Sequence, residues 1–524
     1  MLLRCRLRTI QPRHNYGRDI TRYRVRRRFP HQSPPLSPHE LDTARGAASP
    51  RFAPPRTPWR SVVIHGGVLA LWLVLFARAF GGGGLLAWAV GLVYVGYDTA
   101  LQLFTTWQCR TLLRPLSPEG PEPRAASALA VIVAARNEAA VLPVTLAALL
   151  GQQPPPDLIV VADDGSDDET ATMLRARFGL ELPPLGQKSA AAPGAPSLRW
   201  LRLLPAGKPV ALNAALLSID APIVVTVDAD TLLQPGALAA MRRAFAEDPK
   251  LVAATGILEP VCGRGLVGRV FQGFQRYEYV RNFLSRYAWM RADGLLLISG
   301  AFAAFRTQAL RDVGGFDPDC LVEDYELIHR LRRHAARQGL GWRTAVVGRA
   351  RAVTDAPGSI APFLRQRRRW FGGFLQTQLW YREMVGNPRY GRLGRWMLPV
   401  KAADTLQPVY GLTAFAVLVT SVLRGDGALA LGIVGIMGAK LGIDLAYHLW
   451  SLRLYHRWTG AEGRPPYATG LLAALVEPVS FQLLRHLGAT LGWVTMLTGG
   501  KGWHIGRRAG VLGAANTTPP DGTA

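Results

Sequence analysis

Residues 223–231 read IVVTVDADT, a run of mostly β-branched apolar residues that stops at two carboxylates, Asp228 and Asp230. A run of this kind predicts a buried strand in a parallel sheet. Ligands of doubly wound sheets bind beyond the carboxyl ends of the strands, so both carboxylates would lie where a divalent cation and the phosphates it bridges bind. Taken alone, the stretch is equally compatible with a strand followed by an Asp-rich turn.

The same alternation continues on both sides of this strand, between about residues 125 and 353. Short β-branched runs alternate with helical stretches, which predicts an α/β domain with a largely parallel sheet. Besides 223–227, we expect strands at 129–134, 158–162, 198–203 and 251–257, and helices at 141–150, 169–177, 208–218 and 235–246.

The composition indicates a membrane protein. The 524 residues are 49% hydrophobic and carry a formal net charge of +25, a mixture typical of membrane proteins with basic cytoplasmic surfaces. The basic residues form no recognisable nucleic-acid-binding module, so we expect no nucleic-acid partner. Membrane lipids with anionic headgroups and a phosphorylated substrate account for the charge. The four cysteines lack the paired spacing of a zinc site.

Apolar segments lie on both sides of the α/β domain. Their lengths suit membrane spans, although Glu477 and Pro478 interrupt the last one and predict a broken segment there. By the positive-inside rule, the Arg-rich flanks place the α/β domain in the cytoplasm, at a bacterial inner membrane. The expected boundaries are a disordered basic tail (1–58), a transmembrane hairpin (59–110), the α/β domain (125–360), an interfacial helix (361–392), C-terminal transmembrane and interfacial helices (393–500) and a tail (501–524).

Polar side chains also follow the first two strands of the domain. Asp163 and Asp164 end the second strand, and Arg136 and Glu138 follow the first. Such carboxylates can accept hydrogen bonds from a nucleobase or a ribose, but Asp, Ser and Asn are also the residues that cap helices. We expect Ser166 to be a helix cap and Asp164 to be a ligand.

Glu323 and Asp324, in LVEDYEL, precede a helical stretch. A general base must be ionised and within hydrogen-bonding reach of the hydroxyl that it deprotonates, and an Asp is ionised at neutral pH. The alternative is that both acids lie in the first turn of a helix, where the helix dipole favours them.

The stretch RQRRRWFGG supplies Gln366, Arg369 and Trp370. An Arg can hold a diphosphate and a Trp can stack on a sugar. The same stretch can also form a helix at the membrane interface, with its Arg residues on lipid headgroups. The two interpretations are compatible.

Together these motifs resemble glycosyltransferase family 2, in particular its membrane-integrated branch of cellulose, chitin, hyaluronan and poly-N-acetylglucosamine synthases. The resemblance covers about residues 128–373. The matching motifs, in the family's order, are AARNE (134–138), DDGSDD (163–168), GKPVALN (207–213), DAD (228–230), SGAFAAFR (299–306), GGFD (314–317), VED (322–324) and QRRRW (366–370).

The resemblance implies a GT-A domain between N-terminal and C-terminal transmembrane helices. It further implies an inverting transfer from a nucleotide-sugar donor, usually UDP-linked, with Asp324 as the catalytic base and Asp228 and Asp230 as ligands of Mg²⁺ or Mn²⁺. The residues it implies in substrate or nucleotide binding are Arg136, Glu138, Asp163, Asp164, Lys208, Asp228, Glu323, Gln366, Arg369 and Trp370.

The leading hypothesis is therefore elongation of a β-linked polysaccharide at the inner leaflet, with an export partner left unidentified. The alternative is non-processive transfer of one sugar to a lipid acceptor, because related motifs also occur in such enzymes. A third class, a catalytically silent membrane scaffold that binds sugar, is disfavoured because every expected acid is present.

Overall fold

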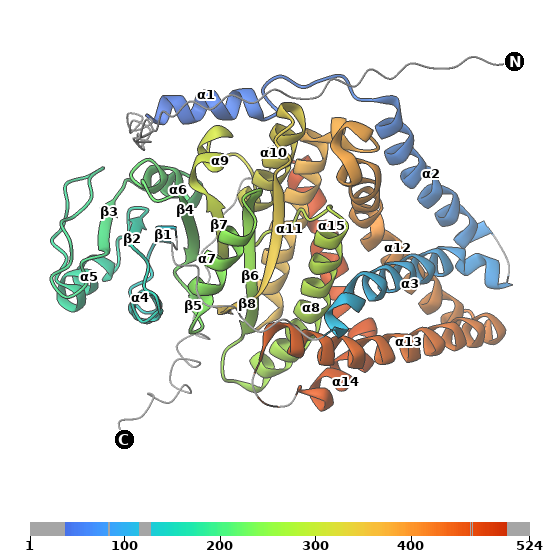
Figure 1. Cartoon of the computed structure of the whole chain (residues 1–524). Helices are drawn as coiled ribbons and strands as arrows, with labels where there is room; N and C mark the ends of the chain where they lie inside the picture. The colour runs from blue at the N-terminus through green and yellow to red at the C-terminus, as the bar shows by residue number, and fades with distance from the viewer. Residues whose placement is uncertain (1–36, 82–83, 115–126, 462, 464, 500–524) are drawn as a thin grey trace, which may run out of the picture. The chain divides into compact units, whose positions relative to one another are not determined.

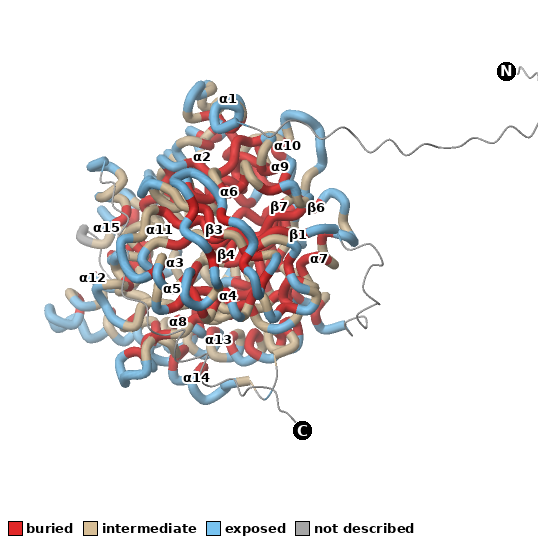
Figure 2. Tube along the Cα trace, turned by 90° about the vertical axis from the view of Figure 1, so that its left-hand side faces the viewer, coloured by how far each residue is buried: buried red, intermediate tan, exposed pale blue. Residues whose placement is uncertain are grey.

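The structure is a computed structural model that describes residues 37–81, 84–114, 127–461, 463 and 465–499 (Figure 1). Its centre is an eight-stranded sheet in the order β3-β2-β1-β4-β7-β6-β8-β5. Figure 2 shows the central strands as a buried layer, consistent with their apolar, β-branched sequences. The strands are β1 (Leu129–Ala135), β2 (Leu158–Asp163), β3 (Leu198–Arg202), β4 (Ile223–Asp228), β5 (Thr231–Leu233), β6 (Leu251–Val261), β7 (Phe302–Arg306) and β8 (Arg343–Asp355).

The sheet is parallel in one half and mixed in the other. Strands β3, β2, β1 and β4 are all parallel, as predicted. Strand β7, which was not predicted, runs antiparallel to both β4 and β6, and β5 runs antiparallel to β8. The five predicted strands are confirmed. The expectation of a largely parallel sheet holds for strands β3, β2, β1 and β4.

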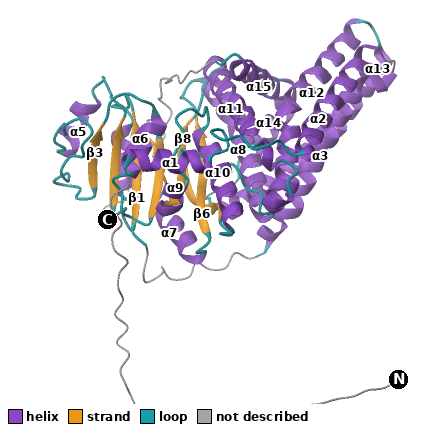
Figure 3. Cartoon of the chain, turned by 90° about the horizontal axis from the view of Figure 1, so that it is seen from above, coloured by secondary structure: helices purple, strands orange, loops and turns teal. Residues whose placement is uncertain are grey.

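Helices connect the strands and cover the sheet. The four predicted connecting helices are confirmed, each end lying within about two residues of its expected place. Helix α8 lies between the sheet and the apolar helices, as Figure 3 shows. The helices of this region are α4 (Leu142–Leu150), α5 (Thr170–Phe178), α6 (Lys208–Leu216), α7 (Ala237–Glu247), α8 (Leu266–Arg291), α9 (Thr307–Asp312), α10 (Glu323–Gln338) and α11 (Ile360–Trp380).

Three helical stretches in the described part of the chain are long and apolar enough to cross a membrane, namely 59–79, 393–423 and 427–459. A helix pair bent by 52° at residue 480 adds a fourth candidate, and this break lies at the predicted interruption. Helix α3, expected as the second arm of a transmembrane hairpin, is not among these long apolar helices. The helices outside the sheet are α2 (Trp59–Gly81), α3 (Ala89–Cys109), α12 (Leu398–Leu423), α13 (Gly427–Thr459), α14 (Tyr467–Val476) and α15 (Phe481–Leu497).

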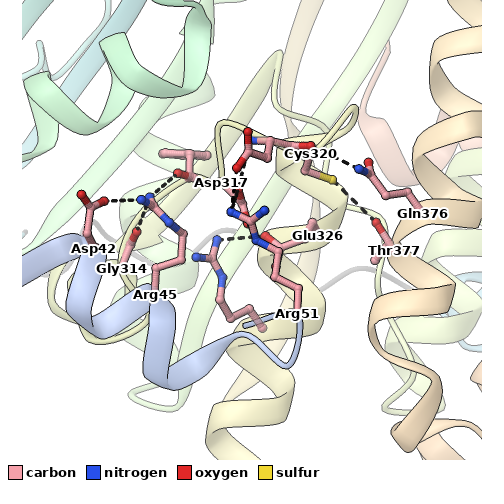
Figure 4. A network of polar contacts seen from close by, with 12 residues as sticks. Asp42, Arg45, Arg51, Gly314, Asp317, Cys320, Glu326, Gln376 and Thr377 are labelled. Carbon is pink, nitrogen blue, oxygen red and sulfur yellow. Dashed lines mark hydrogen bonds and ion pairs between the residues drawn. The ribbon is translucent and has the colours of Figure 1, made fainter. Parts of the chain in front are cut away.

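Part of the segment predicted to be a disordered tail is a helix, α1 (Pro38–Ala48), so that prediction was wrong for these residues. A capping box starts the helix: Ser37 Oγ accepts the Glu40 N–H at 3.3 Å, and the Glu40 carboxylate accepts the Ser37 N–H at 2.6 Å. Arg45 then donates to two backbone carbonyls of the loop before α10 (Figure 4). Residues 1–36 lie outside the described part.

The chain just after α1 also holds the loop that leads into α10. The Arg51 guanidinium lies 2.9 Å from the Asp317 carboxylate and 3.0 Å from that of Asp319 (Figure 4). Asp317 is fully buried, so its charge depends on this partner. The N-terminal segment therefore fixes the start of the helix that carries Glu323 and Asp324.

Helix α11 packs closely on the domain and on α15 through two glycines. A Cβ on Gly373 would lie 2.3 Å from Val322 Cγ2, and one on Gly372 would lie 2.9 Å from the Gly492 carbonyl oxygen. The buried Arg367 of α11 also donates to both Glu278 oxygens of α8, at 2.7 and 2.9 Å. These contacts join the helix of the QRRRW motif to the sheet domain and to the apolar helices.

Replacing Arg367 by Ala should destabilise the protein, because it leaves the buried Glu278 carboxylate with only a distant cation, Arg485 at 3.9 Å. We expect the free energy of unfolding to fall by about 3 kcal/mol. The measurement is denaturant unfolding in detergent, followed by tryptophan fluorescence. Arg368→Ala is the control, since Arg368 forms no ion pair with any described residue, and equal losses in both variants would contradict the prediction.

Candidate active site

The polar ends of three parallel strands lie side by side at one edge of the sheet. The strand register pairs Ala134 with Asp228 and Ala135 with Asp163. A small pocket opens at this edge, and Arg136 and Asp164 line it together with Asp228. Glu138 and Lys208 also contribute to its wall. The pocket thus gathers residues from four motifs that are far apart in the sequence.

Lys208, at the start of α6, joins two of the acidic motifs. Its Nζ lies 2.5 Å from Asp228 Oδ1 and 3.7 Å from Glu323 Oε1. Burial favours the neutral amine, but the Asp228 and Glu323 carboxylates outweigh it and raise the pKa of Lys208 above its usual value. Burial raises the pKa of Glu323, although Lys208 opposes the shift. The ammonium therefore holds the DAD and VED motifs together.

A large cavity of about 1180 Å³ begins at this bridge. It runs past α8 and α11 toward the apolar helices, because residues of α3, α12 and α15 also line it. The predicted site residues in its wall are Lys208, Asp228, Asp230, Glu323, Asp324, Gln366, Arg369 and Trp370. The structure therefore brings these eight residues together in the wall of one cavity.

Asp324 is held in a fixed orientation by backbone amides. The Gly300 N–H donates to its Oδ2 at 2.7 Å, and the Tyr325 N–H donates to its Oδ1 at 2.8 Å. Asp324 lies in the first turn of α10, as the alternative interpretation proposed, and it also faces the cavity. Gly300 belongs to the SGAFAAFR motif, whose contact with Asp324 could not be read from the sequence.

Asp163 and Asp164 have different surroundings. Asp163 accepts the Ser166 N–H at 2.9 Å and the Trp200 indole N–H at 3.2 Å, and it lines neither cavity. Its contacts are those of a residue that shapes the loop, and they give no support to its predicted place in nucleotide binding. Asp164 lines the small pocket, where it accepts the Ala206 and Gly207 amides.

Ser166 is not a helix cap, which corrects the prediction. Its hydroxyl accepts the Asn137 N–H at 3.0 Å, and α5 begins only at Thr170. The Asn137 side chain also exchanges two hydrogen bonds with Asp167, at 2.6 and 2.9 Å. The DDGSDD loop is thereby tied to the loop after β1, because both loops follow neighbouring strand ends.

Helix α11 brings its motif residues to the wall of the large cavity. Arg369 donates to the Leu321 carbonyl at 3.3 Å, and Trp370 packs beneath the Arg367 guanidinium, 4.4 Å from ring centroid to guanidinium carbon. The Gln366 amide oxygen is buried and has no hydrogen-bond partner in the described structure. Arg367 was not singled out in the sequence, although it holds the helix in place through Glu278.

The residues at the sheet edge fit a divalent cation that is shared with a substrate. No group of three or more His, Cys, Asp or Glu side chains in the described chain could hold a metal ion alone. Asp228 and Asp230 nevertheless both face the large cavity. Mg²⁺ in phosphate-handling sites is commonly bound by one or two carboxylates, with substrate phosphates completing the shell. The oxygen ligands present match that requirement.

Gly300→Ala should displace Asp324 without disturbing the nucleotide pocket, since a Cβ there would lie 3.1 Å from the Asp324 Cβ and Oδ2. If Asp324 is the base that the family resemblance implies, turnover should fall roughly 10- to 100-fold. Nucleotide affinity, measured by calorimetry, should stay unchanged. The matched control is Gly273→Ala in α8, where a Cβ meets nothing within 4 Å. Unchanged turnover in Gly300→Ala would contradict the positioning role.

Comparisons with known proteins found a family, a solved structure and curated relatives to which this chain is similar. Residues 124–373 match the family described as "Glycosyltransferase like family 2". The chain is similar to the mannosyltransferase PcManGT from Pyrobaculum calidifontis, solved in complex with GDP-Man and Mn²⁺. That match has a TM-score of 0.49 and 22% identity, and it covers 78% of this chain and 99% of the other.

Two curated relatives are poly-β-1,6-N-acetyl-D-glucosamine synthases. The one from Staphylococcus epidermidis is 27% identical over 206 residues, which are 39% of this chain and 47% of the relative. The one from Staphylococcus aureus strain COL is 29% identical over 168 residues, which are 32% of this chain and 38% of the relative. The chain thus spans less than half the length of the curated relatives it matches. Residues 124–373, which include all eight strands of the sheet, are thus similar to glycosyltransferase family 2.

Proposed function

We propose that this protein transfers a sugar from a nucleotide donor, most simply a UDP-sugar, to a growing β-linked polysaccharide at the cytoplasmic face of a bacterial inner membrane. The observation that carries the proposal is the single cavity that Asp230, Asp324 and Trp370 share, which continues to the apolar helices. The names of the curated relatives support a polysaccharide product. The Arg-rich flanks support the cytoplasmic side.

The nucleotide would bind across the small pocket and the start of the large cavity. Arg136, Glu138 and Asp164 line the small pocket, where they can contact the base and ribose. Asp228 and Asp230 would hold Mg²⁺ or Mn²⁺ together with the diphosphate. When bound, the metal ion stabilises the negative charge that develops on the leaving diphosphate.

Transfer then needs a hydroxyl activated on the other side of the sugar. Asp324 takes the proton from the acceptor hydroxyl as its oxygen bonds to the anomeric carbon, and the bond from that carbon to the diphosphate breaks. Attack opposite the leaving group inverts the anomeric centre. The two amides on Asp324 fix its carboxylate before the acceptor arrives, which lowers the cost of alignment.

The acceptor would occupy the part of the cavity beside α11. The partly buried Trp370 ring can stack on a sugar. The positive charge of Arg369 acts on the Glu323 carboxyl and lowers its pKa, so the two groups lie near each other. A lipid acceptor is the second candidate, since the cavity is also lined by residues of α3, α12 and α15. Those helices could admit an acyl or isoprenyl chain from the bilayer.

A donor panel tests the function. The full chain, in lipid nanodiscs with Mg²⁺ or Mn²⁺, would be incubated with radiolabelled UDP-sugars, and the products sized. We expect one UDP-sugar to give a polymer of high molecular weight. A single sugar in the lipid fraction would replace elongation with glycolipid synthesis, and no transfer from any UDP-sugar would contradict the proposed donor.

Asp324→Asn should abolish transfer while leaving UDP binding within about twofold of wild type, because Asn keeps the shape but cannot accept the proton. Calorimetry with UDP and Mn²⁺ measures binding, and product formation measures transfer. Asp312→Asn is the control, since Asp312 lies on α9 and lines neither cavity. Parallel loss of binding and transfer in Asp324→Asn would contradict its assignment as the base.

A further inference from the structure

The GGFD motif (314–317) stands apart from the other motifs of the site. All eight motifs lie in the described part of the chain, and GGFD is the one that supplies no residue to the wall of either cavity. It starts the loop 314–322, which leads into α10. It instead contacts residues 37–58, which we call the strap because they connect α1 to α2 past this loop. The motif therefore receives a part of the chain that lies outside the α/β domain.

Helix α1 of the strap rests directly on the first glycine of the motif. A Cβ on Gly314 would lie 2.2 Å from the Arg45 backbone nitrogen and 2.4 Å from the Leu41 carbonyl oxygen, so a larger residue would push the helix away. Gly314 also has a φ of 80°, a conformation that favours glycine. The Arg45 side chain donates to the carbonyls of Gly314 and Phe316, at 3.3 and 3.0 Å. The backbone of the motif is therefore shaped to the strap.

Arg51 of the strap binds the last residue of the motif with two nitrogens. Its Nε and Nη2 lie 2.9 and 3.0 Å from the two carboxylate oxygens of Asp317, and Nη2 also donates to Asp319 at 3.0 Å (Figure 4). Among the described residues, Arg51 is the one cation within ion-pair distance of the fully buried Asp317. Its guanidinium carbon also lies 5.2 Å from the centre of the Trp380 ring, at the end of α11. Arg51 therefore joins the loop to α11.

The loop that Arg51 holds also connects the VED and QRRRW motifs. Gln376, on α11, donates to the Asp319 carbonyl at 3.2 Å and accepts the Leu321 N–H at 3.0 Å. Arg369 of the QRRRW motif donates to the Leu321 carbonyl at 3.3 Å. Asp324 follows Leu321 by three residues. A shift of the loop would therefore move Asp324 and α11 relative to each other.

We propose that Arg51 is a positioning residue for sugar transfer, which aligns Asp324 on α10 with the acceptor motif on α11 by holding the loop 314–322. This inference rests on the proposed function and extends it to a residue outside the family-matched residues 124–373. Arg51 lies in the wall of neither cavity, so it acts through Asp317 and Asp319 and not on a substrate. The strap thus belongs to the working unit of the enzyme.

The test removes the ion pair without leaving a buried charge. Arg51→Gln alone would leave the buried Asp317 carboxylate unpaired, which destabilises a fold. Arg51→Gln combined with Asp317→Asn replaces the pair by neutral groups. In lipid nanodiscs, with the donor that the panel identifies, the kcat of this double variant should fall roughly 10- to 100-fold, because Asp324 loses its alignment. The KM for the UDP-sugar should stay within about twofold of wild type, because Arg51 contacts no residue of the small pocket.

Calorimetry with UDP and Mn²⁺ separates positioning from a loss of folded protein, because the number of UDP sites per chain counts the folded molecules. We expect that number to be the same in the wild type and in the double variant. Arg51→Lys, which keeps the charge and loses the planar fork, should retain an intermediate kcat. Arg56→Gln, at an exposed cation of the same strap, is the matched control and should keep the wild-type kcat. An unchanged kcat in the double variant, or a fall that only matches a loss of UDP sites, would overturn the proposal.

A thiol within the loop tests the same contact without any reaction on sugar. The Cys320 side chain is buried, and its Sγ lies 3.8 Å from Thr377 Oγ1 of α11 (Figure 4). A maleimide should label Cys320 at least about tenfold faster in the double variant than in the wild type, because the loop opens more often. Mass spectrometry of the Cys320 peptide measures the rate. Equal labelling rates would overturn the role of Arg51, whereas faster labelling together with no transfer by the wild-type protein would refute the proposed function instead.

Discussion

The Lys208 ammonium is the contact on which the rest of the site depends. It lies between Asp228, at the end of a central strand, and Glu323, at the start of α10. Without this cation, the half-buried Asp228 carboxylate and the buried Glu323 carboxylate would repel each other across the mouth of the cavity. With it, the sheet edge that carries Asp228 and Asp230 and the helix that carries Asp324 are kept together. In the proposed reaction, the donor and Asp324 then act on opposite sides of one sugar.

The membrane-side helices extend this arrangement through buried ion pairs. Arg367 and Glu278 fix α11 to α8, and the small residues Gly372 and Gly373 let α11 approach α15 and the loop before Asp324. From the other face, Arg51 holds Asp317 in the same loop. Asp324 is therefore supported from three directions, by the sheet, by the apolar helices and by the N-terminal segment.

Much of this was predictable because the signals are local. Strand β4 with Asp228 and Asp230, the four connecting helices and the place of Asp324 all follow from short runs of sequence. What escaped prediction depends on partners distant in the chain. Strand β7 is defined by pairing with β4 and β6, helix α1 by docking on the loop before α10, and Asp163 by its bond to Trp200.

The measurement that tests the account most directly is electron paramagnetic resonance of Mn²⁺ titrated into the full chain with UDP. The account predicts one bound Mn²⁺ per chain that requires both UDP and Asp230. The signal of bound Mn²⁺ should disappear in Asp230→Asn and persist in Asp220→Asn, an exposed aspartate that lines neither cavity. Equal Mn²⁺ binding in the two variants would contradict a donor site at the end of β4. Mn²⁺ binding that is the same with and without UDP would contradict it as well.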